Sequence, residues 1–187
     1  MSAGSYERGE SMSRVLGVLV AMTAGVAMLV ASGAQANNDP HRFFAPYDPL
    51  DLPASVCGFP VHIEATVNRE YAKVSSLPDG STVYTFTGSL FAGVANANTG
   101  KAITVNASGP GTIVFSSDFT SAEVMFEGLS LLYATNLTDY GFPSNIVVTS
   151  GLLRGRVTET GTTGLHTVTN ITRKPNVVLD VCAALAP

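Results

Sequence analysis

Apolar and polar residues alternate with a period of two along most of the chain after residue 57. The first clear run is residues 61–68, in which every second position is apolar: Val61, Ile63, Ala65 and Val67. A period of two sends successive side chains to opposite faces of a β-strand. The run therefore predicts a strand with one buried face, and it places His62 and Glu64 on the solvent-exposed face.

Turn-forming residues divide the remaining chain into further runs of the same kind. Pro78-Asp79-Gly80 and Asn98-Thr99-Gly100 are typical of tight turns between antiparallel strands. The longest uninterrupted stretch, 123–133, is predicted to be one long strand that kinks near Gly128. The other predicted strands are residues 82–87, 89–95, 102–107, 112–116, 146–149, 152–158, 165–172 and 177–182.

Strands at this spacing, with no helical pattern after the first 36 residues, predict an all-β fold. We expect a single antiparallel β-barrel or β-sandwich of about nine or ten strands, held together by one disulfide. The barrel is favoured over the sandwich, because a disulfide near both ends of the domain would bring the first and last strands together. Closure would also remove exposed strand edges.

Residues 1–36 have the features of a signal peptide. Arg8 and Arg14 supply positive charge, residues 15–31 are largely apolar, and Ala34-Gln35-Ala36 matches a cleavage site with the cut before Asn37. We therefore expect a secreted, extracellular protein. Anchoring by an uncleaved N-terminal helix is the alternative. A start at Met12 would give a more typical basic end than a start at Met1.

Residues 37–55 contain a proline at about every fourth position, which disfavours helix and central strand. This segment is predicted to be an extended lead-in to an all-β domain at 56–187. Its aromatic residues are expected to pack on the domain, or alternatively to dock a partner; they are Phe43, Phe44 and Tyr47.

The chain has two cysteines, Cys57 and Cys182. In an exported chain two cysteines indicate a structural disulfide, and two free thiols are the alternative. A loop of more than 120 residues gives a stabilisation of about 5 kcal/mol in the chain-entropy treatment. No CxxC motif accompanies them, which argues against a redox or metal-binding role.

The net charge of −4 argues against two classes of partner. Nucleic-acid binding requires a basic stripe, and binding to anionic membranes requires basic clusters. Neither is present in a sparsely charged, mildly acidic chain.

Several short motifs occur in a recognisable order: Cys57-Gly58-Phe59-Pro60-Val61, Asn98-Thr99-Gly100-Lys101, Ser108-Gly109-Pro110-Gly111, Thr149-Ser150-Gly151 and Asp180-Val181-Cys182-Ala183-Ala184-Leu185. In this order the chain resembles an uncharacterised family of small secreted β-rich actinobacterial proteins. The resemblance covers most of the chain after the leader and implies export, an all-β fold and the disulfide. That family has no assigned activity, so the resemblance implies no catalytic residue, cofactor or metal.

A search for catalytic constellations finds no hydrolase, metalloprotease, phosphate-loop or EF-hand motif. No catalytic residue, metal ligand or cofactor is predicted. His62 and His166 are the histidines available to a triad, and both are interpreted as surface residues. Glu123 and Glu127 would stand about 13 Å apart on a straight strand, too far for a glycosidase pair.

Arg154 and Arg156 share one face of a predicted strand and form a weak candidate anion-binding site. The alternative is that they offset neighbouring acids such as Glu159 or Asp180.

These observations favour a secreted, non-enzymatic β-domain that binds a ligand or a component of the cell envelope. If the fold were a barrel, its inward face could hold an apolar small molecule, lined by Tyr84, Phe86 and Phe91; a filled core is the alternative. The second hypothesis is a small exported enzyme, a hydrolase or barrel isomerase with an apolar pocket. It requires His62 or His166 to point inward beside an acid such as Glu64.

Overall fold

The computed structural model describes residues 42–160 and 165–187. The predicted signal peptide and its cleavage site at Ala36 and Asn37 lie outside these residues. The described chain is all-β, apart from a 3₁₀-helix η2 (Leu137–Tyr140) and one short helix α1 (Val181–Leu185). Neither described helix is long and apolar enough to cross a membrane.

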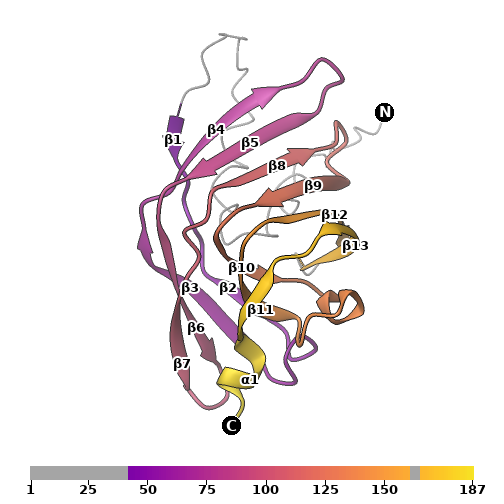
Figure 1. The fold of residues 1–187 in the computed structure, drawn as a ribbon. Helices are drawn as coiled ribbons and strands as arrows, with labels where there is room; N and C mark the ends of the chain where they lie inside the picture. The colour runs from indigo at the N-terminus through magenta and orange to yellow at the C-terminus, as the bar shows by residue number, and fades with distance from the viewer. Residues whose placement is uncertain (1–41, 161–164) are drawn as a thin grey trace, which may run out of the picture.

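Fourteen strands form three antiparallel sheets in the described residues (Figure 1). The strands are β1 (Arg42–Phe44), β2 (Leu50–Leu52), β3 (Val61–Asn68), β4 (Tyr71–Ser76), β5 (Thr82–Thr87), β6 (Leu90–Asn96), β7 (Ala102–Asn106), β8 (Gly111–Phe115), β9 (Ser121–Phe126), β10 (Leu129–Tyr133), β11 (Ile146–Ser150), β12 (Leu153–Thr160), β13 (Leu165–Arg173) and β14 (Asn176–Asp180).

The large sheet has seven strands in the order β1-β4-β5-β8-β9-β12-β13, which is also their order in the sequence. The strands that lie between these in the sequence, together with β14, form two smaller sheets, β2-β3-β6-β7 and β10-β11-β14. Three of the bends contain a glycine with positive φ: Gly88 at 137°, Gly128 at 77° and Gly151 at 108°. Glycine adopts such angles without the strain that a Cβ introduces.

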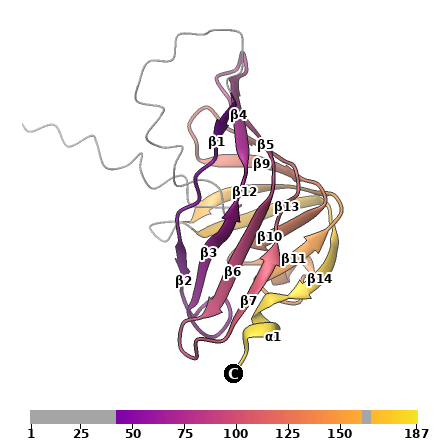
Figure 2. The same cartoon turned by 90° about the vertical axis from the view of Figure 1, so that its left-hand side faces the viewer.

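Two apolar cores fill the spaces between the sheets. The first lies under the large sheet and includes Phe86 and Val124, and it reaches Leu132 and Val147 of the three-stranded sheet. The second core lies between the four-stranded sheet and the three-stranded sheet. It includes residues of the three-stranded sheet that alternate with those of the first core, such as Ile146. Strands β10 and β11 therefore contribute to both cores and lie between the other two sheets. Figure 2 views the four-stranded sheet with β10 and β11 beside it.

The preferred barrel prediction is wrong for the described strands. The large sheet ends at β1 and β13, each of which has one neighbour, and the smaller sheets separate between β7 and β10. The physical reason is the set of bends, which lets the two halves of each long strand join different sheets. Burial is then achieved by sheets that face one another, as in a sandwich.

The predicted count of nine or ten strands is also too low. The stretch predicted as one strand is two, β9 and β10, divided at Gly128 where the kink was expected. Strand β4 was missed because its sequence, with Lys73 and two serines, alternates weakly. Strands β1 and β2 lie in the lead-in and were missed because prolines surround them, although Pro46, Pro49 and Pro53 all fall outside the strands.

Candidate functional site

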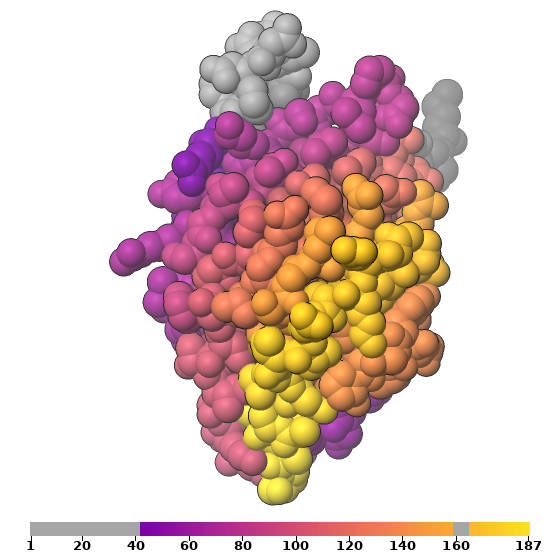
Figure 3. Space-filling view, viewed as in Figure 1, coloured from indigo at the N-terminus to yellow at the C-terminus, as the bar shows by residue number. Residues whose placement is uncertain are grey.

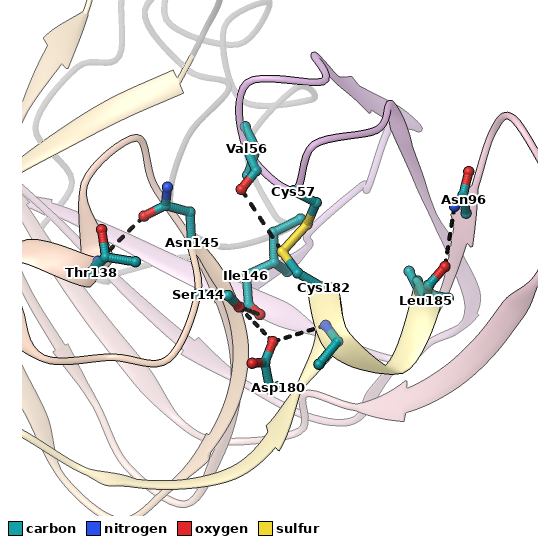
Figure 4. The surroundings of a disulfide bond; sticks show 11 residues. Val56, Cys57, Asn96, Thr138, Ser144, Asn145, Ile146, Asp180, Cys182 and Leu185 are labelled. Carbon is teal, nitrogen blue, oxygen red and sulfur yellow. Dashed lines mark hydrogen bonds between the residues drawn. A yellow bond between two sulfur atoms is a disulfide. The ribbon is translucent and has the colours of Figure 1, made fainter. Parts of the chain in front are cut away.

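The disulfide between Cys57 and Cys182 is formed, with 5.2 Å between the Cα atoms, and it confirms the predicted pairing. It joins the turn before β3 to helix α1, so it links two sheets that face each other, and β3 and β14 are not paired neighbours. No free cysteine occurs among the described residues. Figure 4 shows the disulfide with the sulfur of Cys182 against the carbonyl of Val56, 3.8 Å away.

Polar contacts fix helix α1 at both ends around this disulfide. Asp180 is its N-cap, and its carboxylate accepts hydrogen bonds from the backbone N–H of Ala183 at 3.1 Å and from the hydroxyl of Ser144 at 2.7 Å (Figure 4). At the other end Asn96 donates to the carbonyl of Leu185 at 3.1 Å. Figure 3 shows the C-terminal segment lying along the molecule to its tip. The surroundings of the disulfide are therefore structural.

The predicted anion-binding pair, Arg154 and Arg156, lies exposed on β12, on the outer face of the large sheet. Arg156 forms an ion pair with Glu123 on β9, at 2.9 Å between Nη2 and Oε1. Arg154 has no carboxylate partner in the described part of the chain, and its Nη2 lies 3.9 Å from the sulfur of Met125. The two arginines therefore have different interaction partners in the structure.

His62 lies on the outer face of the four-stranded sheet, as its strand pattern predicts. Its Nδ1 is 2.7 Å from the carboxylate of Asp51, the cross-strand neighbour on β2. Its Nε2 is 3.9 Å from the carboxylate of Glu64. Beside them on β6 stand only small residues, Gly93 and Ala95. The trio is a partly exposed polar group on the outer face of the four-stranded sheet.

His166 was predicted to lie on the surface, and the structure places it inside, at 5% exposure. Neither of its ring nitrogens has a hydrogen-bond partner among the described residues. Burial lowers the pKa of His166 to about 3, with a smaller opposing effect from the backbone of Thr158. No described carboxylate lies within ion-pair distance of it. Its cross-strand neighbour on β12 is Glu159. Among the residues whose side chains the structure describes, the inward histidine required by the enzyme hypothesis has no acid partner.

Glu70 is a buried acid that the sequence did not indicate. Its side chain is 1% exposed, between β3 and β4, and its Oε1 has no hydrogen-bond partner in the described residues. Its backbone is anchored, because its N–H donates to Asn68 and its carbonyl accepts from Ala45. Burial raises the pKa of Glu70 to about 8.

Tyr47 is the other buried polar group without a partner for its hydroxyl in the described residues. Burial raises its pKa, and the neighbouring Tyr133 adds to the increase. Tyr47 packs against the second core and Phe43 against the first, so the packing interpretation is confirmed for these two aromatic residues.

Phe44 differs from the other aromatic residues of the lead-in. It is 50% exposed and meets Tyr71 edge to face at 6.2 Å between ring centroids. The guanidinium of Arg42 lies 4.4 Å from the centre of the Tyr71 ring. Together they form a small exposed cation–π group at the β1 edge of the large sheet.

The residues expected to line an apolar pocket are mostly core. Tyr84 and Phe86 are buried and stack at 6.2 Å between centroids, whereas Phe91 is partly exposed on another sheet. An apolar cavity of about 20 Å³ lies between β12 and β10, lined by residues such as Leu132 and Val157. That volume accommodates about one water molecule. It is too small for an apolar ligand.

Glu123 and Glu127 do not form a catalytic pair on one strand. Glu123 belongs to β9, whereas Glu127 follows that strand at the Gly128 bend. In the part of the chain that the structure describes, no three or more histidine, cysteine or acidic residues are arranged to hold a metal ion.

Comparisons with protein-family models, with curated proteins and with solved structures gave no significant match to this chain.

Proposed function

We propose that this protein is an exported, non-enzymatic domain that binds a component of the cell envelope through the exposed faces of its sheets. Its disulfide supports export, because such bonds persist mainly in oxidising compartments. The resemblance to small secreted actinobacterial proteins points the same way.

One observation carries the choice of a surface over an internal pocket. The described charged groups that combine several side chains, namely Asp51 with His62 and Arg156 with Glu123, lie on outer sheet faces. Among the described residues, the interior contains two apolar cores, and the cavity between β12 and β10 is too small for a ligand. An apolar small molecule is thus a less suitable partner than a surface-bound envelope polymer. Among the side chains that the structure describes, none gives His166 the acid partner that the enzyme alternative requires.

Export and binding are tested with the full chain produced in an actinobacterial host. Protein recovered from the medium is expected to begin at Asn37 and to be two hydrogen atoms lighter than its reduced form, by intact-mass spectrometry. The same protein is expected to sediment with the host's isolated cell-wall fraction in a saturable manner. Retention in the cytoplasm in the reduced form would contradict export. Recovery entirely in the supernatant would contradict envelope binding.

A further inference from the structure

Three arginines occupy the outer face of the β12–β13 ribbon. Arg154 and Arg156 alternate on β12, and Arg173 on β13 is the direct cross-strand partner of Arg154. All three side chains are exposed. Sequence reasoning paired Arg154 with Arg156 because they are two residues apart. It missed Arg173 because the strand pairing that brings it close depends on the register.

The positions of Arg154 and Arg173, directly opposite each other, are electrostatically unfavourable. Like charges directly opposite each other in an antiparallel pair destabilise it. Arg156 is neutralised by Glu123 at 2.9 Å. Neither Arg154 nor Arg173 forms an ion pair with any described carboxylate, so their two charges face each other without compensation.

The backbone of the ribbon is irregular at the same place. The register of β12 against β13 shifts between Arg154 and Gly155 and again between Arg156 and Val157. Bulges of this kind redirect side chains and are enriched beside functional sites. A Cβ at Gly155 would lie 2.6 Å from the carbonyl oxygen of Asn170, so this close approach of the strands requires glycine.

We propose that Arg154 and Arg173 form an anion-binding site for a phosphate or carboxylate group. Each guanidinium presents two parallel N–H donors, which match the oxygens of such a group, and an anion between them would remove their mutual repulsion. On the β9 side Arg154 faces Met125, whereas on the β13 side it faces Arg173, so the anion lies toward β13. This proposal rests on the proposed function. The expected ligand of the site is an anionic group of an envelope polymer.

The test is an NMR titration of the oxidised protein, produced from the full chain, with inorganic phosphate and separately with galacturonate. Saturable shifts are expected at the backbone amides of Arg154, Thr172 and Arg173. The variants Arg154→Gln and Arg173→Gln are each expected to weaken binding about tenfold, the contribution of one charge-assisted hydrogen bond. Arg154→Lys is expected to be intermediate, because it keeps the charge and loses the fork.

Arg69→Gln is the matched control, since Arg69 is an exposed arginine in the turn between β3 and β4, outside β12 and β13. It is expected to bind within about twofold of the parent, the scatter of bulk screening. Equal weakening of anion binding in all the variants would show that binding depends only on the overall charge of the protein. That result would contradict the proposed site. Absence of saturable shifts with both anions would also overturn it.

Cell-wall sedimentation separates the site from the proposed function. Anion binding without sedimentation would keep the site and contradict envelope binding. Sedimentation unchanged by Arg154→Gln and Arg173→Gln would contradict the site as the envelope contact while leaving the proposed function in place.

Discussion

Glu70 and His166 are both buried as neutral groups, and each makes the stability of the fold depend on pH. The folded pKa of Glu70, about 8, lies above its ordinary value of 4.5. The folded pKa of His166, about 3, lies below its ordinary value of 6.5. Each shift of one pKa unit corresponds to about 1.4 kcal/mol of stability. Neither burial was visible in the sequence, because side chains of both types most often lie on the surface.

For Glu70 the loss of stability lies on the alkaline side. Between pH 4.5 and 8 the folded protein keeps a proton that the unfolded chain has lost, so stability falls as pH rises. Glu70→Gln stays neutral and is expected to match the parent near pH 4 and to exceed it by about 4 kcal/mol at pH 8. Urea denaturation at both pH values measures this. An equal difference at the two pH values would show that Glu70 is not protonated in the folded state.

For His166 the loss of stability lies on the acidic side. Between pH 6.5 and 3 the unfolded chain binds a proton that the folded protein does not, so stability falls as pH falls. With both groups present, their effects oppose each other between pH 4.5 and 6.5, and thermal unfolding is expected to show a plateau there. Below pH 4.5 the stability of the parent is expected to decline because His166 is protonated only in the unfolded chain. His166→Phe is expected to lack this contribution to the decline. A decline of the same slope in that variant would place its origin elsewhere.

At the scale of single elements, the bends decide which sheet each half-strand joins. Gly128 was identifiable in the sequence, because a glycine interrupts an otherwise continuous strand pattern. The roles of Gly88 and Gly109 were not, because they depend on which backbone lies opposite. A Cβ at Gly88 would lie 2.2 Å from the carbonyl oxygen of Arg69, and one at Gly109 would lie 2.1 Å from that of Glu127.

Gly88→Ala is therefore expected to destabilise the fold by more than about 3 kcal/mol, because a strained φ and a backbone clash coincide. Gly100→Ala is the control, since Gly100 also has positive φ, at 72°, but no atom lies within 4 Å of its added Cβ. It is expected to lose only about 1 kcal/mol. Chemical denaturation of both variants gives the comparison. Similar losses would show that the clash at Gly88 is relieved by movement of the bend.

At the scale of the whole molecule, the disulfide holds the C-terminal helix and the four-stranded sheet together across the second core. Cys57 and Cys182 are separated by 125 positions, so the bond restricts the unfolded chain over most of its length. Helix α1 has further polar anchors from Asn96 and Ser144, and Lys101 donates to the carbonyl of its C-cap residue Ala186 at 2.7 Å.

The double variant Cys57→Ala/Cys182→Ala is expected to lose about 3–5 kcal/mol of unfolding free energy, as for closure of a long loop. Guanidinium denaturation of the oxidised parent, the reduced parent and the variant measures this. The reduced parent and the variant are expected to agree. A loss below about 1 kcal/mol in both would show that the unfolded chain is already compact around these residues.

The alternating pattern, the turns and the two cysteines were sufficient to determine the all-β class, most strand positions, the kink at Gly128 and the disulfide. These features are local or, for the cysteines, follow from having a single possible partner. The sequence did not determine the three-sheet arrangement, the burial of Glu70 and His166, or the opposition of Arg154 and Arg173. Those depend on which strands pair and in which register, and strand pairing is a contact between distant parts of the chain that a local period of two does not encode.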